Sequence, residues 1–207
     1  MITSSKTAKR RASVLFTLLI FASPLFSATS AEEKQIAELY RRGLAGDATA
    51  VERCIEKLDM ALKQEPQNHL ARVYLGSTYT LRSRDMGFGP KKLQVVRQGC
   101  RTMDEAVAAA PENPKVRLVR ALTDQSLPFF LGRKKTAQED WHHILSILGR
   151  NPRALTEDDL QVVYYTTGIA AKETGNRPRA EELLAKAAEH PVDPALAAKV
   201  NAARGKK

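Results

Sequence analysis

Residues 161–194, QVVYYTTGIAAKETGNRPRAEELLAKAAEHPVDP, decide the fold class that this sequence predicts. Within them Gly168, Ala180 and Ala187 are spaced by twelve and then seven residues, and Leu184 lies between the last two. Two helices that pack closely need small side chains where they touch. The spacing places the small residues at such a contact, so the stretch predicts two helices folded back on each other.

Turn-forming clusters divide the chain at similar intervals. They begin at Pro66, Pro111, Asn151 and Pro191, and each contains at least one proline. Proline cannot donate the helical hydrogen bond and disfavours helical geometry in the residue before it, so each cluster predicts the end of a helix. The clusters recur roughly every 40 residues, the length of a two-helix unit. Because the apolar residues between them have helical spacing, we expect an all-α chain of stacked helical hairpins.

This organisation resembles the tetratricopeptide repeat (TPR), a unit of 34 residues that forms two antiparallel helices. Residues 161–194 match the unit best, with its three small residues in place. Residues 69–113 match at both ends, around an insertion of about eleven residues near residues 84–90. Residues 35–68 and 114–154 match more loosely.

The unit over residues 114–154 departs most from the pattern, because Asp140 and Ile147 stand where the repeat has small residues. The resemblance implies a right-handed stack of antiparallel helical hairpins, a TPR-like α-solenoid, over residues 32–194. Stacked repeats need a cap at their ends. Residues 195–207 are accordingly expected to form a C-terminal capping helix and a basic tail.

The first 31 residues have the features of an export signal. A basic lead that ends at Arg10-Arg11 precedes an apolar run from Val14 to Phe26, and the small residues Thr29-Ser30-Ala31 follow. The run is shorter than the roughly 20 residues that a membrane-spanning helix needs. We expect cleavage after Ala31, a periplasmic or secreted protein, and no stable membrane span after cleavage. Retention of the segment as an anchor is the alternative.

The chain is basic, but the distribution of its charge does not indicate a nucleic-acid partner. The full chain carries a net charge of +10, and removal of the signal with its four basic residues would leave +6. Proteins that bind nucleic acid gather such charge along one face. Here the basic residues are scattered, so a nucleic-acid partner is not expected.

Two cysteines, Cys54 and Cys100, lie 46 residues apart. At equivalent places on stacked helices their Cα atoms would be about 8–10 Å apart, whereas a disulfide needs Cα atoms within about 7 Å. The interpretation favoured is two buried thiols. A disulfide stays open as the alternative, because an exported protein meets an oxidising compartment.

The strongest candidate for catalysis is the segment from Glu139 to His143, which contains His142. Adjacent histidines on a helix point about 100° apart and cannot bind one metal from one face. Glu139 and His143 are one turn apart, but two ligands are too few for a metal site. We interpret Trp141 and Ile144 as buried, with one histidine in water. Since no nucleophile, histidine and acid follow a catalytic order, we expect no enzyme activity, cofactor or metal.

Two predicted connections carry phenylalanine. Residues 87–92, GFGPKK, superficially resemble a phosphate-binding loop but lack its Gly-Lys-Ser/Thr end and a preceding strand. They are interpreted as a flexible connection, and a binding loop with an exposed Phe88 is the alternative. Phe129 and Phe130 are expected to pin one hairpin to the next in the core. The alternative is an exposed aromatic patch beside residues 133–135, RKK, that holds an acidic peptide or a lipid headgroup.

The TPR resemblance also implies a binding groove on the concave face, lined by the first helix of each unit. Carried over position by position, the residues that line it are Leu70, Val73, Ser77, Thr80, Leu118, Leu122, Gln125, Tyr165, Ile169 and Lys172. This line is apolar with polar interruptions, which suits an amphipathic helix or an extended peptide.

The function expected is therefore an exported, non-catalytic scaffold that binds a peptide or protein partner. Three alternatives stay open. One is an enzyme accessory or a metal-dependent enzyme that uses His142 and His143. The second is a homodimer formed through the groove. In the third, the groove residues bury against each other or against the C-terminal helix.

Overall fold

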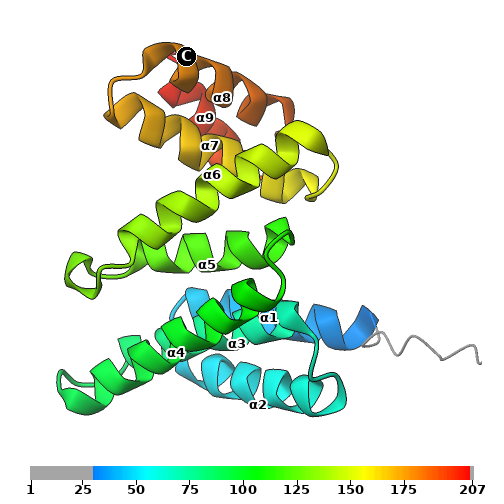
Figure 1. The fold of residues 1–207 in the computed structure, drawn as a ribbon, viewed down its shortest axis with the longest axis vertical. Helices are drawn as coiled ribbons and strands as arrows, with labels where there is room; N and C mark the ends of the chain where they lie inside the picture. The colour runs from blue at the N-terminus through cyan, green and yellow to red at the C-terminus, as the bar shows by residue number, and fades with distance from the viewer. Residues whose placement is uncertain (1–29, 206–207) are drawn as a thin grey trace, which may run out of the picture.

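The computed structural model describes residues 30–205 of the 207-residue chain (Figure 1). Its helices are α1 (Ser30–Leu44), α2 (Ala48–Gln64), α3 (His69–Arg84), α4 (Pro90–Ala109), α5 (Pro114–Ser126), the 3₁₀ turn η1 (Phe129–Leu131), α6 (Lys134–Arg150), α7 (Glu157–Glu173), α8 (Arg177–Glu189) and α9 (Pro194–Ala203). No strand occurs in this range, so the predicted all-α class is confirmed. The predicted export signal falls almost wholly outside the described residues.

Short polar side chains and prolines set the helix boundaries. Asp47 caps α2 by accepting the N–H of Ala50, Asn68 caps α3 in the same way, and Thr156 caps α7. α2, α4, α6 and α8 all end one or two residues before the predicted turn clusters begin. Among the described helices, none combines the length and the apolar character that a bilayer crossing requires.

Neighbouring helices pack in successive pairs. α1 packs on α2, α3 on α4, α5 on α6 and α7 on α8, while α3 also contacts α2 and α5. Figure 1 shows the pairs following one another along the longest axis, from α2 at one end to α8 and α9 at the other. Helix α9 packs on α7 and α8 through the fully buried Val200, so a helix covers this end of the described chain.

The predicted close contact between α7 and α8 is confirmed. A Cβ atom on Gly168 would lie 2.9 Å from Cγ of Leu184, and Ala180 and Ala187 on α8 are buried. A still tighter contact joins α3 to α4. There a Cβ on Gly76 would lie 2.6 Å from the carbonyl oxygen of Gly99, and a Cβ on Gly99 would lie 2.5 Å from that of Gly76.

Buried ion pairs join α4, α5 and α6. Asp140, at a position where the pattern predicted a small residue, is fully buried and pairs with Arg117 and Arg120. Arg120 and Arg133 both reach Asp104 on α4. The sequence pattern registered Asp140 only as a misfit, because its partners lie on another helix.

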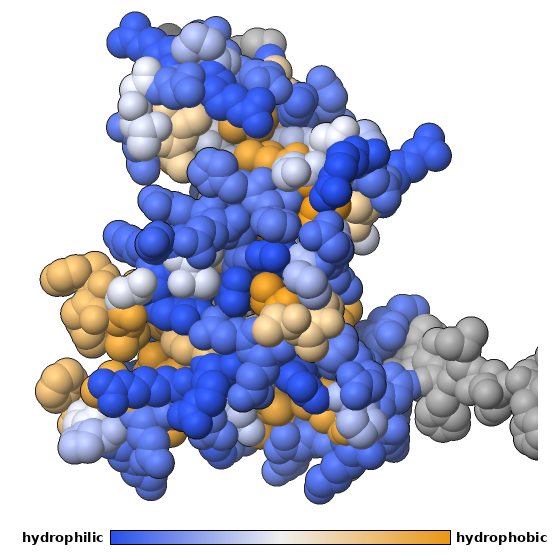
Figure 2. All heavy atoms as spheres, in the orientation of Figure 1, coloured by the Kyte–Doolittle hydropathy of each residue, from blue (hydrophilic) through white to orange (hydrophobic). Residues whose placement is uncertain are grey.

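Two expectations for the connections need correction. The insertion near residues 84–90 is a turn of only five residues, and the remaining length extends α4 to 20 residues. Phe129 and Phe130 do not pin one hairpin to the next, because they are 80% and 66% exposed. The whole stretch 125–136 is open to solvent: its residues are exposed, apart from the half-buried Leu127, Leu131, Arg133 and Thr136. Figure 2 shows apolar residues gathered at the edge where these turns lie.

Cys54 and Cys100 are free and buried, as the favoured interpretation held. Burial raises the pKa of both thiols, and that of Cys100 rises to about 11. At pH 8 such a thiol is about 0.1% thiolate, against roughly a quarter for a free cysteine. We expect Ellman's reagent at pH 8 to modify neither cysteine in the native protein and both in denaturant. Rapid modification of the native protein, or no reaction after denaturation, would contradict this.

Candidate functional site

A groove of about 330 Å³ lies between α1, α3, α5 and the first turn of α7. Its lining is mainly apolar and aromatic and consists of Tyr40, Leu44, Tyr74, Ser77, Thr80, Leu81, Lys115, Leu118, Val119, Leu122, Thr123, Ser126 and Asp159. Four of the predicted partner-binding residues belong to it, namely Ser77, Thr80, Leu118 and Leu122. The structure thus brings these residues of α3 and α5 together in one groove.

The other six predicted residues lie elsewhere. Val73 is fully buried among residues of α4 and α5, and Leu70 is exposed near the start of α3. Gln125 accepts the indole N–H of Trp141 at 3.0 Å. Tyr165 packs at the margin of the C-terminal core, and Ile169 is half-buried.

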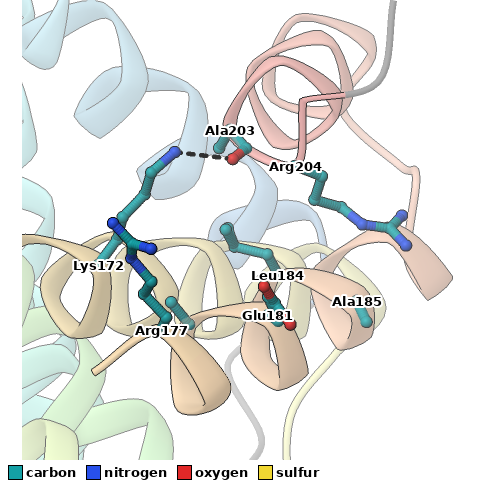
Figure 3. Close-up of a pocket in the computed structure, with 8 residues that line it drawn as sticks. Lys172, Arg177, Glu181, Leu184, Ala185, Ala203 and Arg204 are labelled. Carbon is teal, nitrogen blue, oxygen red and sulfur yellow. Dashed lines mark hydrogen bonds between the residues drawn. The ribbon is translucent and has the colours of Figure 1, made fainter. Parts of the chain in front are cut away.

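The sixth residue, Lys172, belongs to a second hollow of about 750 Å³ where α7, α8 and α9 meet (Figure 3). Its Nζ donates to the carbonyl oxygen of Ala203 at 2.9 Å, which holds the end of α9 against α7. Arg177, Arg204 and Glu181 also line this hollow. The alternative in which a groove residue packs on the C-terminal helix therefore describes Lys172.

A chain of buried hydroxyl groups runs under the groove. Oγ1 of Thr123 donates to the carbonyl oxygen of Val119, so Thr123 accepts from Oγ of Ser77 at 2.7 Å. Ser77 has then used its proton, so Oη of Tyr40 donates to Ser77 at 2.8 Å. Thr80 donates to the carbonyl oxygen of Ser77. These donors are satisfied inside the protein, so the groove floor offers them to no ligand and presents mainly apolar surface.

Two tyrosines, Tyr40 of α1 and Tyr74 of α3, line the groove in contact with each other. The rings of Tyr40 and Tyr74 meet edge to face with centroids 5.0 Å apart, which fixes both rings. Burial raises the pKa of each phenol to about 12, so both stay neutral at ordinary pH. Neither tyrosine is among the residues that the sequence predicted for the groove. The signal was present, because the two tyrosines are 34 residues apart, one repeat length.

The groove is charged at one end and open and apolar at its rim. Nζ of Lys115 lies 2.6 and 2.7 Å from the carboxylate oxygens of Asp159, which belongs to the first turn of α7. Leu44 and Leu122 are 54% and 40% exposed at the rim. An apolar ligand would cover these leucines and meet the ion pair at one end.

The histidine pair lies apart from the groove. Nδ1 of His142 contacts the backbone oxygen of Gln138 in its own helix, and Nε2 of His143 lies 3.4 Å from Glu112. Both histidines are exposed, while Trp141 and Ile144 are buried as interpreted. Within residues 30–205, no three histidine, cysteine or acidic side chains are grouped so that they could hold a metal ion.

Comparison with known proteins adds no assignment for this chain. The chain matches no protein-family model, and no curated protein matches the chain significantly.

Proposed function

We propose that this chain is an exported TPR-like scaffold that binds an apolar segment of a peptide or protein partner without catalysis. In this proposal the helix pairs form a right-handed solenoid of antiparallel hairpins. The first helix of each pair then faces the partner. The pairing of α1 with α2, α3 with α4 and α5 with α6 supports it, as does a groove lined by α1, α3 and α5.

One observation carries the proposal, namely a mainly apolar groove in which the hydroxyl groups of Tyr40, Ser77, Thr80, Thr123 and Ser126 already donate to oxygen atoms of the protein. Such a floor favours a hydrocarbon or aromatic side chain over a polar ligand. The volume of about 330 Å³ is at the lower end of the roughly 300–1,000 Å³ of ligand pockets. We therefore expect one or two large apolar side chains to anchor the partner, with Lys115 and Asp159 setting its register.

The absence of catalysis is part of the same proposal. The groove lining contains serine and threonine but no histidine or cysteine. Ser77 and Thr123 donate to neighbouring oxygen atoms rather than to a basic side chain. Activation of a nucleophile needs an adjacent base, and the lining provides only the carboxylate of Asp159, which is paired with Lys115.

Leu122→Lys tests the groove. The native protein would be used to select binders from a library of random peptides, and selected peptides are expected to share large apolar residues. Because Leu122 is 40% exposed, lysine is tolerated there and leaves the protein folded. It places a charge against the ligand, and we expect the Kd of the selected peptides to rise roughly 10- to 100-fold.

Leu70→Lys is the matched control, because Leu70 is 37% exposed on α3 but lies outside the groove lining. Its Kd for the same peptides should match that of the wild-type protein. Equal Kd values for Leu122→Lys and wild type would overturn the proposal. If Leu122→Lys instead converts a dimer to a monomer in analytical ultracentrifugation, the groove is a self-association surface.

A further inference from the structure

Three phenylalanine side chains project from the surface at two turns. Phe88 is 99% exposed in the turn between α3 and α4, and Phe129 and Phe130 are 80% and 66% exposed in the turn between α5 and α6. Phenylalanine is among the residues that folding most often buries. Three such exposed rings on one side of a protein indicate a surface that contacts something else.

The two turns lie at one edge of the molecule. Helices α3 and α5 pack on each other and each ends at its turn. Figure 1 shows both turns on the left of the view, and Figure 2 shows apolar residues gathered there. Arg133 lies at the end of the turn between α5 and α6 and pairs with Asp104 of α4. The ion pair therefore links this turn to α4, the helix that follows the other turn. We call this surface the aromatic edge.

The second turn holds its rings in a defined arrangement. The rings of Phe129 and Phe130 meet edge to face with centroids 6.4 Å apart. Gly132 follows with a φ of +70°, and its N–H donates to the carbonyl oxygen of Phe129. A side chain at a positive φ is disfavoured, so glycine permits the tight reversal into α6. The phenylalanines therefore protrude from a closed turn.

Positive charge surrounds the rings. Lys91, Lys134 and Lys135 begin α4 and α6 directly beside the two turns, and all three are exposed. In the described part of the chain, Lys91 and Lys134 form no ion pair, and Lys135 only approaches Glu139 at 3.9 Å. Two acids lie near the turns, and both are paired: Asp124 is fully buried beside Arg133, and Asp85 at the start of the first turn pairs with Arg84. The aromatic edge is thus apolar at its tips and basic at its base.

We propose that the aromatic edge docks this protein on a lipid bilayer that contains anionic phospholipids. The phenylalanines enter the boundary between headgroups and acyl chains, and the lysines meet the phosphate groups. This combination of aromatic tips with lysines behind them matches the two layers of such a surface.

The shape of the edge favours a bilayer over two other occupants. None of the three phenylalanines lines either hollow described above. Convex tips give a peptide no groove to lie in, whereas lipids rearrange around a protrusion. A second copy would bring the same lysines face to face, and like charges across an interface are unfavourable.

Vesicle binding tests the proposal. The full chain is sedimented with vesicles of phosphatidylcholine alone and with vesicles that also contain phosphatidylglycerol. We expect binding to the second kind that weakens as salt is raised. Phe129→Ser combined with Phe130→Ser is expected to weaken it roughly tenfold or more, since each ring loses its apolar contact. Lys134→Glu combined with Lys135→Glu should weaken it similarly.

Met60→Ser combined with Lys63→Glu is the matched control. It removes one exposed apolar residue and reverses one exposed lysine on α2. Both sites lie near the turn that begins α3, at the end of α3 opposite the aromatic edge. The control should bind vesicles like the wild type. Circular dichroism should show the same melting curve for every variant, because the substituted side chains are exposed.

Phe130→Trp reports insertion directly. The chain has one tryptophan, Trp141, which is buried and gives a constant background. On vesicles with phosphatidylglycerol, the new tryptophan should emit at shorter wavelength and be quenched by brominated acyl chains. Because quenching occurs at residue 130, it separates the aromatic edge from any contact made by the N-terminal segment.

Four results would overturn the proposal. They are no quenching at residue 130, vesicle binding that ignores the phenylalanine substitutions, a change of oligomeric state in the same variants, and binding of poly-glutamate that depends on Phe129 and Phe130. The third result would assign the edge to a second copy of the chain. The fourth would assign it to an acidic peptide. The groove proposal is independent of all four, because no residue of the aromatic edge lines the groove.

Discussion

Asp140→Ala is expected to lower the free energy of unfolding by about 3–5 kcal/mol. Asp140 is fully buried, and its Oδ1 accepts from Nη1 of Arg117 at 2.6 Å. Oδ2 accepts from Nε of Arg120 at 2.8 Å. Removing the carboxylate leaves two largely buried guanidinium groups without their main counter-charge. Urea denaturation followed by circular dichroism would measure the loss.

Glu182→Ala is the control for an exposed carboxylate. Glu182 also contacts two basic residues, Arg179 and Lys186, but all three side chains are more than 40% exposed. Because water screens such pairs, the free energy of unfolding should hardly change. A loss for Asp140→Ala no larger than that for Glu182→Ala would show that the buried network does not hold α5 to α6.

Gly76→Ala is expected to lower the free energy of unfolding by about 1–3 kcal/mol or more. The new Cβ would lie 2.6 Å from the carbonyl oxygen of Gly99 and 2.8 Å from the backbone nitrogen of Met103. These atoms belong to helix backbone and cannot rotate away, so α3 and α4 must separate. The added cavity along their contact opposes folding. Thermal and urea denaturation would both register the change.

Gly149→Ala is the control, because it should change the free energy of unfolding in the opposite direction. Gly149 lies in α6, and a Cβ there would meet no atom within 4 Å. Alanine in a helix is more favourable than glycine by roughly 0.5–1 kcal/mol, so this variant should be as stable as the wild type or more so. If Gly76→Ala were also stabilising, the close contact between α3 and α4 would not constrain the fold.

The all-α class and the helix ends were predictable because their causes are local. Prolines at 66, 111 and 152 stop helices without help from distant residues. The contact of Gly168 with Leu184 was predictable for a related reason, since a hairpin brings residues about 16 apart into register. The boundaries of α7 and α8 follow from the same short stretch.

The groove was predictable only in part. Ser77, Thr80, Leu118 and Leu122 line it, but Val73 occupies a similar position in the pattern and is fully buried. The reason is that α4 and α5 both pack over Val73, through Met103 and Val116 among others. How far one helix pair is rotated against the next decides which residues stay accessible, and no local pattern encodes that rotation.

The exposure of Phe129 and Phe130 could not be derived from composition. Apolar residues at a turn are buried only if a neighbouring helix reaches over them. Here α6 begins at Lys134 and its first buried residue is Ala137, so the turn projects beyond the packed ends of α5 and α6. The lengths of neighbouring helices, rather than the turn itself, expose the rings.

The order of residues alone determined the helices and their ends, because these depend on neighbours within one or two turns of chain. It also determined the contact of Gly168 with Leu184, because both residues belong to one short hairpin. Tertiary packing determined the long-range polar contacts and the groove. Asp140 meets Arg117 from 23 residues away, and Tyr40 meets Ser77 from 37 residues away. Such pairs form only when whole helices are placed against each other, and the free energy of that placement is shared among many side chains. The misfit at Asp140 thereby becomes a buried network, and a predicted line of groove residues becomes a groove of four helices.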